Sequence, residues 1–410
     1  MGKGPQAALP VVAGRKILLT SRSGQLGGME LRMADEARFL ASDGHRCVLA
    51  PSDFPDRHPW IDQLAAENPL FSTLDFNPPP FFEQWQWRRT NHLLSRAFWL
   101  PRLRRVGVDF AHVFYAWTQE GGSRIWLCHR LGIPTVLSVH NAFPRANFSP
   151  WHAELMREAF GSVRGLYAVS ASALDHFLAT YGDFIRRDAV VTVIPNFVDV
   201  DRFAPRPELR TALRRELGIP ESARVVGAVG RLDVQKQPLQ MLEVFDRLWA
   251  QRRDIYLVLC GRGPLEPQVR AEVSRREWAD RVRILGFQPD VENVFQMLDV
   301  HLLLSRQEGF GIATAEAMAC GLPVVATDVP GSRDVVADGC GTLVPFGDAA
   351  AAATAVAGYF DDPDASRNAG IAGRARACRY YSPAVWRGNL KSFYSATLPH
   401  TGHRHQELVA

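Results

Sequence analysis

The chain has 410 residues, with 47% hydrophobic and 22% charged side chains and a net charge of +4. This length predicts two or three domains that each bury their own core, and we expect two. The composition is that of a globular protein and excludes fibrous and disordered classes. The small net charge excludes a dedicated histone-like binder but permits a basic face toward phosphates or anionic lipid, and we expect no nucleic-acid partner.

The first part of the chain alternates apolar, branched runs with amphipathic stretches, which predicts parallel sheets covered by helices. The initial pattern is a strand over 16–20, a helix over 28–41 and a strand over 46–50. Further strands are expected at 109–113, 134–139, 165–169 and 190–194.

Three prolines interrupt this rhythm between 195 and 207, where we expect the linker between two domains. A second alternating series follows, with strands predicted at 224–229, 255–260, 281–285, 300–304 and 323–326, and a last helix near 383–398. We therefore predict an α/β protein with two doubly wound, Rossmann-like domains that face a cleft. The expected divisions are 1–200, 201–382, and a crossover helix and tail at 383–410.

The six cysteines are scattered without a Cys-x-x-Cys pair, which indicates neither a zinc site nor a disulfide framework and favours a reducing compartment. The apolar run at 7–13 is too short for a signal peptide. No window reaches the roughly 18 apolar residues of a membrane-spanning helix. We expect a cytoplasmic protein whose membrane contact, if it has one, is peripheral.

The segment 305–326 leaves a predicted strand, makes a glycine-flanked loop and enters a short helix near Ile312. A helix start offers N–H groups and a positive dipole end to a phosphate. Glu308 lies in the loop and Glu316 lies one turn inside the helix, where it could accept hydrogen bonds from a ribose diol. The alternative for both glutamates is a solvated surface position.

Arg231 and Lys236 follow the strand predicted at 224–229, where two cations can bind a diphosphate. Gly27 and Gly28 lie between the first strand and the first helix, and glycine there lets a ligand approach the backbone closely, although a tight structural turn is the alternative. His140 ends another predicted strand, where a loop or core-edge position competes with a role in catalysis.

Together these segments resemble the retaining GT-B glycosyltransferases of family 4, over about residues 16–393. The segment from Glu308 to Glu316 is similar to the family's Glu-x7-Glu signature, in which the first carboxylate contacts sugar hydroxyls and the second binds the ribose. Gly230 to Gln237 resembles the family's Gly-Arg-Leu-x-x-x-Lys-Gly element, with Gln237 in place of the last glycine.

The resemblance implies transfer of a sugar from a nucleoside diphosphate donor without a metal or another cofactor. It assigns Glu308 and His140 to catalysis. It assigns to donor binding Gly27, Gly28, Arg231, Lys236, Phe287, Gly309, Phe310, Gly311, Ile312 and Glu316. The segment 195–199 is similar to the family's linker motif, with Phe197 replacing glycine, which weakens a functional role for Asn196.

Several other patterns are interpreted as structural. Asp199 and Asp201 have the Asp-x-Asp form of metal-dependent transferases but lie in the linker, and Asp362 and Asp364 form a surface turn. The tail histidines His400, His403 and His405 lie in a polar terminus. Gly261 and Gly263 lack the rest of a dinucleotide fingerprint, and we expect this segment to lie with Phe287 around the nucleobase.

Two rival functions stay open: another GT-B enzyme, namely a nucleotide-sugar epimerase or an inverting transferase, and a non-catalytic sugar-nucleotide binding module. The acceptor is undefined, and a polysaccharide or lipid-linked glycan is a candidate. Residues 81–107 hold six arginines, one acid and three tryptophans, which suits an anionic membrane surface. The alternative, slightly favoured, is a helix that buries in its own core Phe82, Trp85, Leu93, Leu94 and Trp99.

Overall fold

The computed structural model describes residues 14–23, 27–52, 59–81, 87–115, 121–337 and 339–398. The chain forms two compact units, one made of Met1–Ile194 with Arg387–Ala410 and the other of Pro195–Trp386. We call them unit 1 and unit 2. The divisions expected from the sequence lay at 200 and 382, a few residues from these limits.

Unit 1 is built on a parallel sheet in the order β3-β2-β1-β4-β5-β6-β7 over its described residues. Its strands and helices are β1 (Lys16–Ser21), α1 (Gly28–Ser42), β2 (Arg46–Pro51), α2 (Pro59–Ala66), β3 (Phe71–Thr73), α3 (Arg88–Leu94), the π-helical η1 (Ser95–Trp99), α4 (Leu100–Val106), β4 (Phe110–Tyr115), α5 (Gly122–Arg130), β5 (Thr135–Val139), α6 (Pro150–Phe160), β6 (Val163–Ala168), α7 (Ala171–Tyr181), η2 (Gly182–Phe184) and β7 (Val190–Val193).

Unit 2 contains a second parallel sheet, in the order β10-β9-β8-β11-β12-β13. Its elements are α8 (Pro207–Glu216), β8 (Arg224–Val229), α9 (Pro238–Trp249), β9 (Ile255–Cys260), α10 (Glu266–Ser274), η3 (Ala279–Arg281), β10 (Val282–Gly286), α11 (Val291–Met297), β11 (Val300–Leu303), α12 (Ile312–Ala319), β12 (Val324–Thr327), α13 (Ser332–Val335), β13 (Gly341–Val344), α14 (Ala349–Asp361) and α15 (Pro363–Tyr380).

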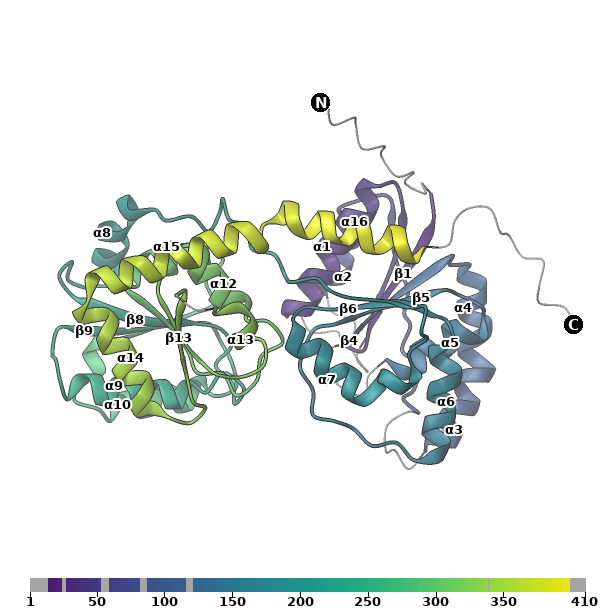
Figure 1. The fold of residues 1–410 in the computed structure, drawn as a ribbon, viewed down its shortest axis with the longest axis horizontal. Coiled ribbons are helices and arrows are strands. Elements are labelled where there is room, and N and C mark those ends of the chain that lie inside the picture. The colour runs from purple at the N-terminus through teal and green to yellow at the C-terminus, as the bar shows by residue number, and fades with distance from the viewer. Residues whose placement is uncertain are drawn as a thin grey trace, which may run out of the picture. The chain divides into compact units, whose positions relative to one another are not determined.

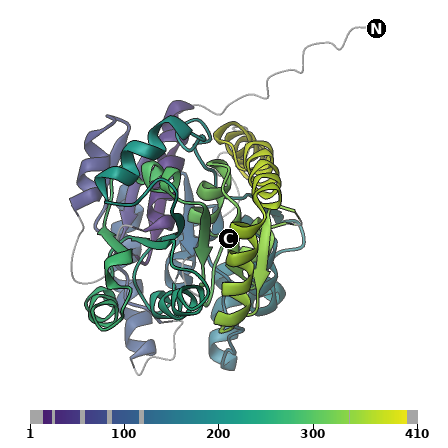
Figure 2. The same cartoon turned by 90° about the vertical axis from the view of Figure 1, so that its left-hand side faces the viewer.

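Helices cover both faces of each sheet (Figure 1), and Figure 2 shows this layering for unit 2. Because both faces are covered, central strands such as β5, β9 and β12 are buried along their whole length. The prediction of two doubly wound α/β domains is confirmed. The strands β3 and β13 were not predicted, because each is a short edge strand without a continuous apolar run.

The last helix, α16 (Pro383–Thr397), belongs to unit 1 from Arg387 onward. Its buried stripe follows the helical period, with Leu390, Phe393, Tyr394 and Thr397 all at most 5% exposed. Gly165 of β6 provides space for it, because a Cβ there would lie 2.6 Å from a Thr397 methyl carbon. Burying a side chain the size of Leu390 or Phe393 contributes about 1.5–3 kcal/mol, so this stripe holds the C-terminal helix on unit 1.

Candidate functional site

The predicted donor-binding residues of unit 2 follow two neighbouring strands. Strands β8 and β11 lie side by side, and the sheet order reverses between them. Arg231 and Lys236 follow β8, while Glu308 follows β11. At such a switch point the two loops diverge beyond the carboxyl ends of the strands, which is where open α/β sheets bind ligands.

A buried ion pair joins the two loops. The Lys236 ammonium contacts Glu308 Oε1, and Ser305 Oγ donates a hydrogen bond of 2.6 Å to the same oxygen. The Lys236 and Glu308 side chains are only 18% and 7% exposed. Gln235 ties the loops further, because its Nε2 donates to the Gln307 carbonyl at 2.9 Å. The structure therefore brings Lys236 and Glu308 together, and it adds Ser305, which the sequence analysis had not singled out.

Arg231 is much more exposed than Lys236. Its side chain is 65% exposed and pairs with Asp233 at 3.1 Å. Asp233 also accepts the backbone N–H of Lys236 at 3.0 Å, which closes the turn that carries both cations. A small hollow at the end of β8 is lined by Gly230, Arg231 and Lys236 together with apolar side chains. An exposed guanidinium beside a half-buried ammonium is an arrangement that can bind a diphosphate.

The predicted helix over the donor segment is present as α12, and it begins at Ile312. Gly311 precedes it with φ of +95°, a conformation that favours glycine. Glu316 lies one turn inside α12 and is half-buried. Phe310 is 3% exposed and packs edge-on against Tyr381 at 5.1 Å, so its side chain supports the loop from within.

Three glycines make close backbone approaches around this loop cluster. A Cβ on Gly331 would lie 2.6 Å from the Glu308 carbonyl oxygen, and one on Gly261 would lie 1.9 Å from the Gly230 carbonyl oxygen. A Cβ on Gly263 would meet the Leu232 carbonyl oxygen at 2.3 Å. These glycines therefore support the loops that carry Arg231 and Glu308. The Pro-Gly turn at Gly331 is a sequence signal that could have identified it.

Phe287 follows β10 and is 69% exposed, which is unusual for a large aromatic side chain and leaves its ring available for stacking. The Asp-x-Asp pattern is a local turn: Asp199 Oδ1 accepts the backbone N–H of Asp201 and of Arg202. Asp362 caps the start of α15 in the same way. The tail histidines lie outside the described residues.

In unit 1, His140 directly follows β5 and is half-buried. Its Nε2 lies 2.9 Å from Ser138 Oγ. Burial lowers the pKa of His140 to about 3, with smaller contributions from His112 and Arg32, so the imidazole is neutral at ordinary pH. Gly27 caps helix α1 and Gly28 begins it, whereas residues 24–26 of that loop lie outside the described residues.

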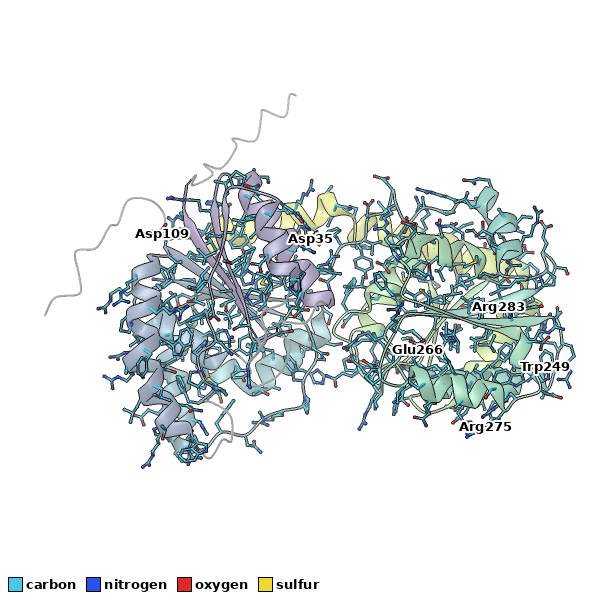
Figure 3. The ribbon with its side chains drawn as sticks, turned by 180° about the vertical axis from the view of Figure 1, so that it is seen from behind. Asp35, Asp109, Trp249, Glu266, Arg275 and Arg283 are labelled. Carbon is cyan, nitrogen blue, oxygen red and sulfur yellow. The ribbon has the colours of Figure 1, made fainter. Side chains whose placement is uncertain are left out.

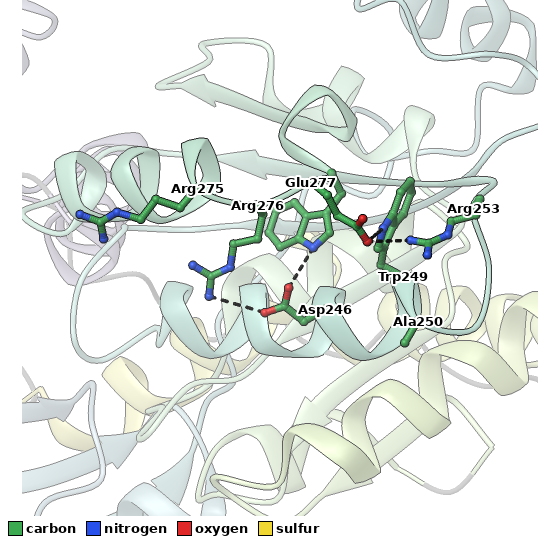
Figure 4. A pocket seen from close by; sticks show the side chains of 8 residues that line it. Asp246, Trp249, Ala250, Arg253, Arg275, Arg276 and Glu277 are labelled. Carbon is green, nitrogen blue, oxygen red and sulfur yellow. Dashed lines mark hydrogen bonds and ion pairs between the residues drawn. The ribbon is translucent and has the colours of Figure 1, made fainter.

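A cavity of about 670 Å³ lies in unit 2, away from these loops, at the C-terminal end of α9. Its charges are already paired, because Arg253 and Trp249 Nε1 both bind Glu277, while Asp246 accepts from Trp278 Nε1 (Figure 4). Figure 3 shows Trp249 and Arg275 at the periphery of unit 2. We assign this network to stability.

The segment 87–106 forms one continuous helical stretch, from α3 through η1 to α4. The alternative that it buries its own apolar residues is wrong for Leu93 and Leu94, which are 64% and 40% exposed. Trp99 does pack on the core, 5.6 Å edge-on from Phe76. The inward face carries His92, Ser95 and Trp99 instead, which have the spacing of one face of a helix. Phe82 and Trp85 lie outside the described residues.

Among the described residues, no group of three or more histidine, cysteine, aspartate or glutamate side chains is arranged to hold a metal ion. Over the same residues, no helix is both long and apolar enough to cross a membrane. All six cysteines are free.

The sequence matches two family models, one for each unit. The model described as Glycosyltransferase Family 4 matches residues 26–202, and the model described as Glycosyl transferases group 1 matches residues 210–376. The alpha-maltose-1-phosphate synthase of Mycolicibacterium smegmatis is 32% identical over 278 residues, which are 61% of this chain and 70% of that protein. The lipopolysaccharide core biosynthesis mannosyltransferase LpsB of Rhizobium meliloti is 31% identical, over 48% of this chain and 58% of its own length.

The fold matches solved structures over nearly the whole chain. Anabaena HepE, in complex with UDP, superposes with a TM-score of 0.72 at 20% identity, covering 93% of this chain and 100% of that one. Two doubly wound sheets, the paired lysine and glutamate at the switch point of unit 2, and these similarities lead to one conclusion: the chain belongs to the family 4 glycosyltransferases and has the GT-B fold.

Proposed function

We propose that the protein transfers a sugar from a nucleoside diphosphate sugar to a glycan acceptor with retention of the anomeric configuration, and that it needs no metal ion. The observation that carries the proposal is the cluster of Lys236, Glu308 and Ser305 at the switch point of unit 2, with Arg231 beside it. Such a cluster can bind a diphosphate through its cations and the hydroxyls of a sugar through its carboxylate.

The donor diphosphate binds Arg231, Lys236 and the N-terminus of α12. The Lys236 ammonium contacts Glu308. When a diphosphate arrives, the ammonium gains phosphate oxygens as partners, and Glu308 becomes available to sugar hydroxyls while Ser305 keeps its carboxylate in place. Glu316, which lies in α12, accepts hydrogen bonds from the ribose hydroxyls, and Phe287 stacks on the base.

The transfer breaks the bond between the sugar C1 and the leaving phosphate oxygen and forms a bond between C1 and the acceptor oxygen on the same face. The acceptor proton passes to the departing phosphate oxygen, so the products are the glycoside and a nucleoside diphosphate. The cations and helix N–H groups stabilise the charge that grows on the leaving diphosphate, which is the part a metal ion takes in other transferases.

A thermal-shift screen across UDP-, GDP- and ADP-sugars tests donor binding, because a ligand at 100 times its dissociation constant adds about 2.7 kcal/mol to native stability. The HepE complex with UDP makes uridine the first nucleoside to test. NMR of the transferred sugar then gives the product configuration. Inversion would establish the inverting rival, a changed free sugar nucleotide would establish the epimerase, and binding without turnover would establish the binding module.

A helical surface of unit 1 suggests where the acceptor is held. The described part of the helical stretch, which we call the 87–106 helix, exposes Trp87, Leu93 and Phe98 to 63%, 64% and 67%. Among them stand six arginines, and residues 87–107 contain no aspartate or glutamate. Exposed apolar side chains interleaved with cations on one helix match the chemistry of an anionic bilayer surface.

We infer that this helix binds the anionic cytoplasmic face of a membrane, and that the acceptor is a lipid-linked glycan held there. Sedimentation with anionic vesicles tests it. Because each arginine near the surface contributes about 1 kcal/mol, changing Arg102, Arg104 and Arg105 together to Gln should weaken binding by roughly 100-fold. The matched control changes three exposed arginines of unit 2, Arg253, Arg275 and Arg367, to Gln. Equal, weak binding of the unaltered protein to anionic and neutral vesicles would refute the inference.

A further inference from the structure

Glu308 lies in an irregular loop, because residues 304–311, between β11 and α12, belong to no helix or strand. The loop is nevertheless buried at two key positions: Ser305 is fully buried and Glu308 is 5% exposed. Buried backbone groups need hydrogen-bond partners. The partners of this loop therefore determine where the Glu308 carboxylate lies.

The first partner comes from the neighbouring strand. The pairing of β11 with β12 ends at Leu303 and Ala326. Beyond that point the hydroxyl of Thr327 donates a hydrogen bond of 2.6 Å to the Ser305 carbonyl oxygen, and both residues are fully buried. The Thr327 side chain thus replaces the ladder hydrogen bonds that end there, and it fixes Ser305 beside β12.

The second partner is Gln235, in the loop that follows β8. The backbone N–H of Arg306 donates to the Gln235 carbonyl at 2.8 Å, and Gln235 Nε2 donates to the Gln307 carbonyl at 2.9 Å. Gln235 therefore binds two consecutive residues of the other loop, one through its backbone and one through its side chain. Because Gln235 directly precedes Lys236, these contacts also set the spacing between Lys236 and Glu308.

The carboxylate of Glu308 is held through one of its oxygens. Ser305 Oγ donates to Oε1 at 2.6 Å, and the Lys236 ammonium contacts the same oxygen. Both donors lie on Oε1, so Oε2 is the oxygen that is left for a sugar hydroxyl. In the proposed function the ammonium is shared with the diphosphate, whereas the single proton of the Ser305 hydroxyl stays on Glu308.

We propose that Thr327 and Gln235 are positioning residues for the carboxylate of Glu308. They hold the segment 305–307, which keeps the Ser305 hydroxyl on Oε1 and presents Oε2 to a hydroxyl of the donor sugar. The proposal rests on the proposed function in one respect, the contact between Glu308 and the sugar. The benefit is a carboxylate that is already oriented when the donor binds, since a misplacement of about 1 Å can cost roughly 100-fold in rate.

A second threonine provides a matched control. Thr135 is also fully buried, and its hydroxyl also binds a backbone carbonyl, that of Ile133, at 3.0 Å. It is the first residue of β5 in unit 1, at the opposite end of that strand from His140. Thr→Val keeps the shape of the side chain and removes one buried hydrogen bond at either position, so both variants should lose similar stability. Only Thr327→Val disconnects Ser305 from β12.

The first measurement is crystallographic and needs no substrate. In the unaltered full-length protein and in Thr135→Val, we expect Glu308 in one conformer with Oε1 on the Ser305 hydroxyl. In Thr327→Val, Glu308 should leave this position or occupy more than one conformer. Thr327→Ser keeps the hydroxyl and should restore the single conformer, which loss of the threonine methyl group alone would not do.

Gln235→Met is a second variant, in case Thr327→Val does not fold. Methionine keeps the length of the glutamine side chain but has no amide to bind the Gln307 carbonyl, so Glu308 should lose its fixed position here as well. An unchanged Glu308 conformer in whichever of these two variants folds would overturn the proposal.

The second measurement is turnover, followed as the release of UDP from UDP-glucose with water as the acceptor. Thr327→Val should lose about tenfold in kcat, the effect of one hydrogen bond, with little change in KM. Thr327→Ser and Thr135→Val should stay close to the unaltered protein, and an equal loss in Thr135→Val would overturn the proposal. If Glu308 loses its fixed position in Thr327→Val while turnover is unchanged, the positioning contacts stand and the role of Glu308 in the proposed function fails.

Discussion

The two units hold their candidate residues in different ways. In unit 2 the residues come from two short segments, 230–237 and 305–316, which follow adjacent strands and meet through the pair of Lys236 and Glu308. In unit 1 the buried Glu36 accepts hydrogen bonds from Tyr167 and Tyr394, which lie far from it in the sequence. The first arrangement can be recognised as a motif, whereas the second exists only after the chain has folded.

The largest expected effect is on turnover and lies in unit 2. Glu308→Gln keeps the shape of the side chain but removes the charge that we propose faces the sugar, so kcat should fall by roughly 100-fold or more. Donor affinity should change much less. Glu316→Gln should do the reverse, weakening donor binding with a smaller loss of kcat, because we propose that Glu316 binds the ribose. Steady-state kinetics with calorimetric donor titration separates the two. Full turnover in Glu308→Gln would contradict the assignment.

The second effect concerns the exposed cation of the same cluster. Arg231→Ala should cost donor binding about 1.5–3 kcal/mol, the usual value of a hydrogen bond to a charged group. Stability should hardly change, because the pair of Arg231 with Asp233 is exposed. Arg367→Ala, which changes an exposed arginine of unit 2, is the control. EDTA should leave activity unchanged, and activity that is lost to chelation and restored by Mn²⁺ would contradict the metal-free account.

A third prediction concerns the pH dependence of stability and a buried histidine of unit 2. His301 is fully buried, and burial lowers its pKa to about 3, with Lys236 contributing. Its folded-state pKa lies below the unfolded value near 6.5, so its contribution is complete above pH 6.5 and is lost as the pH falls below that. His301→Gln should remove about 1–2 kcal/mol of the fall in unfolding free energy between pH 6.5 and 5, measured by urea titration. An identical fall in the variant would show that His301 is protonated in the folded state.

The smallest effect is expected at Gln237, which stands where the resembled family has glycine. It has φ of +53°, a left-handed conformation that costs a non-glycine residue about 1–2 kcal/mol. Gln237→Gly relieves this strain and loses the side-chain bond to the Val234 carbonyl, so we expect a gain of about 1 kcal/mol in unfolding free energy. A loss of stability would show that the side-chain bond outweighs the strain.

Much of the fold could be predicted because buried parallel strands are continuous apolar runs. The limits predicted at 224–229 and 255–260 coincide with β8 and β9, and the start of α12 at Ile312 is also confirmed. The short edge strands β3 and β13 lack such runs and were missed. The exposed position of Leu93 and Leu94 was not predicted either, because the face that meets the core is set by tertiary contacts such as that of His92 with Trp126.

The residues of the candidate site could be predicted from the sequence, but the contacts between them could not. Spacing placed Arg231, Lys236 and Glu308 after strands, but the strand order that makes β8 and β11 neighbours is a property of the whole sheet. For the same reason no local pattern indicates that Tyr394 reaches Glu36, because 358 residues separate them. Residue roles in sugar transfer stay predictions in both units.

The most direct test of the account is a calorimetric titration of Lys236→Met with the nucleoside diphosphate that the donor screen identifies. Methionine keeps much of the apolar stem of lysine, and Ser305 still donates to Glu308. The account predicts a dissociation constant at least tenfold higher than that of the unaltered protein, because one charge-assisted contact to the diphosphate is lost. An unchanged dissociation constant in a variant that is folded by circular dichroism would contradict the claim that the cluster at the switch point of unit 2 binds the donor.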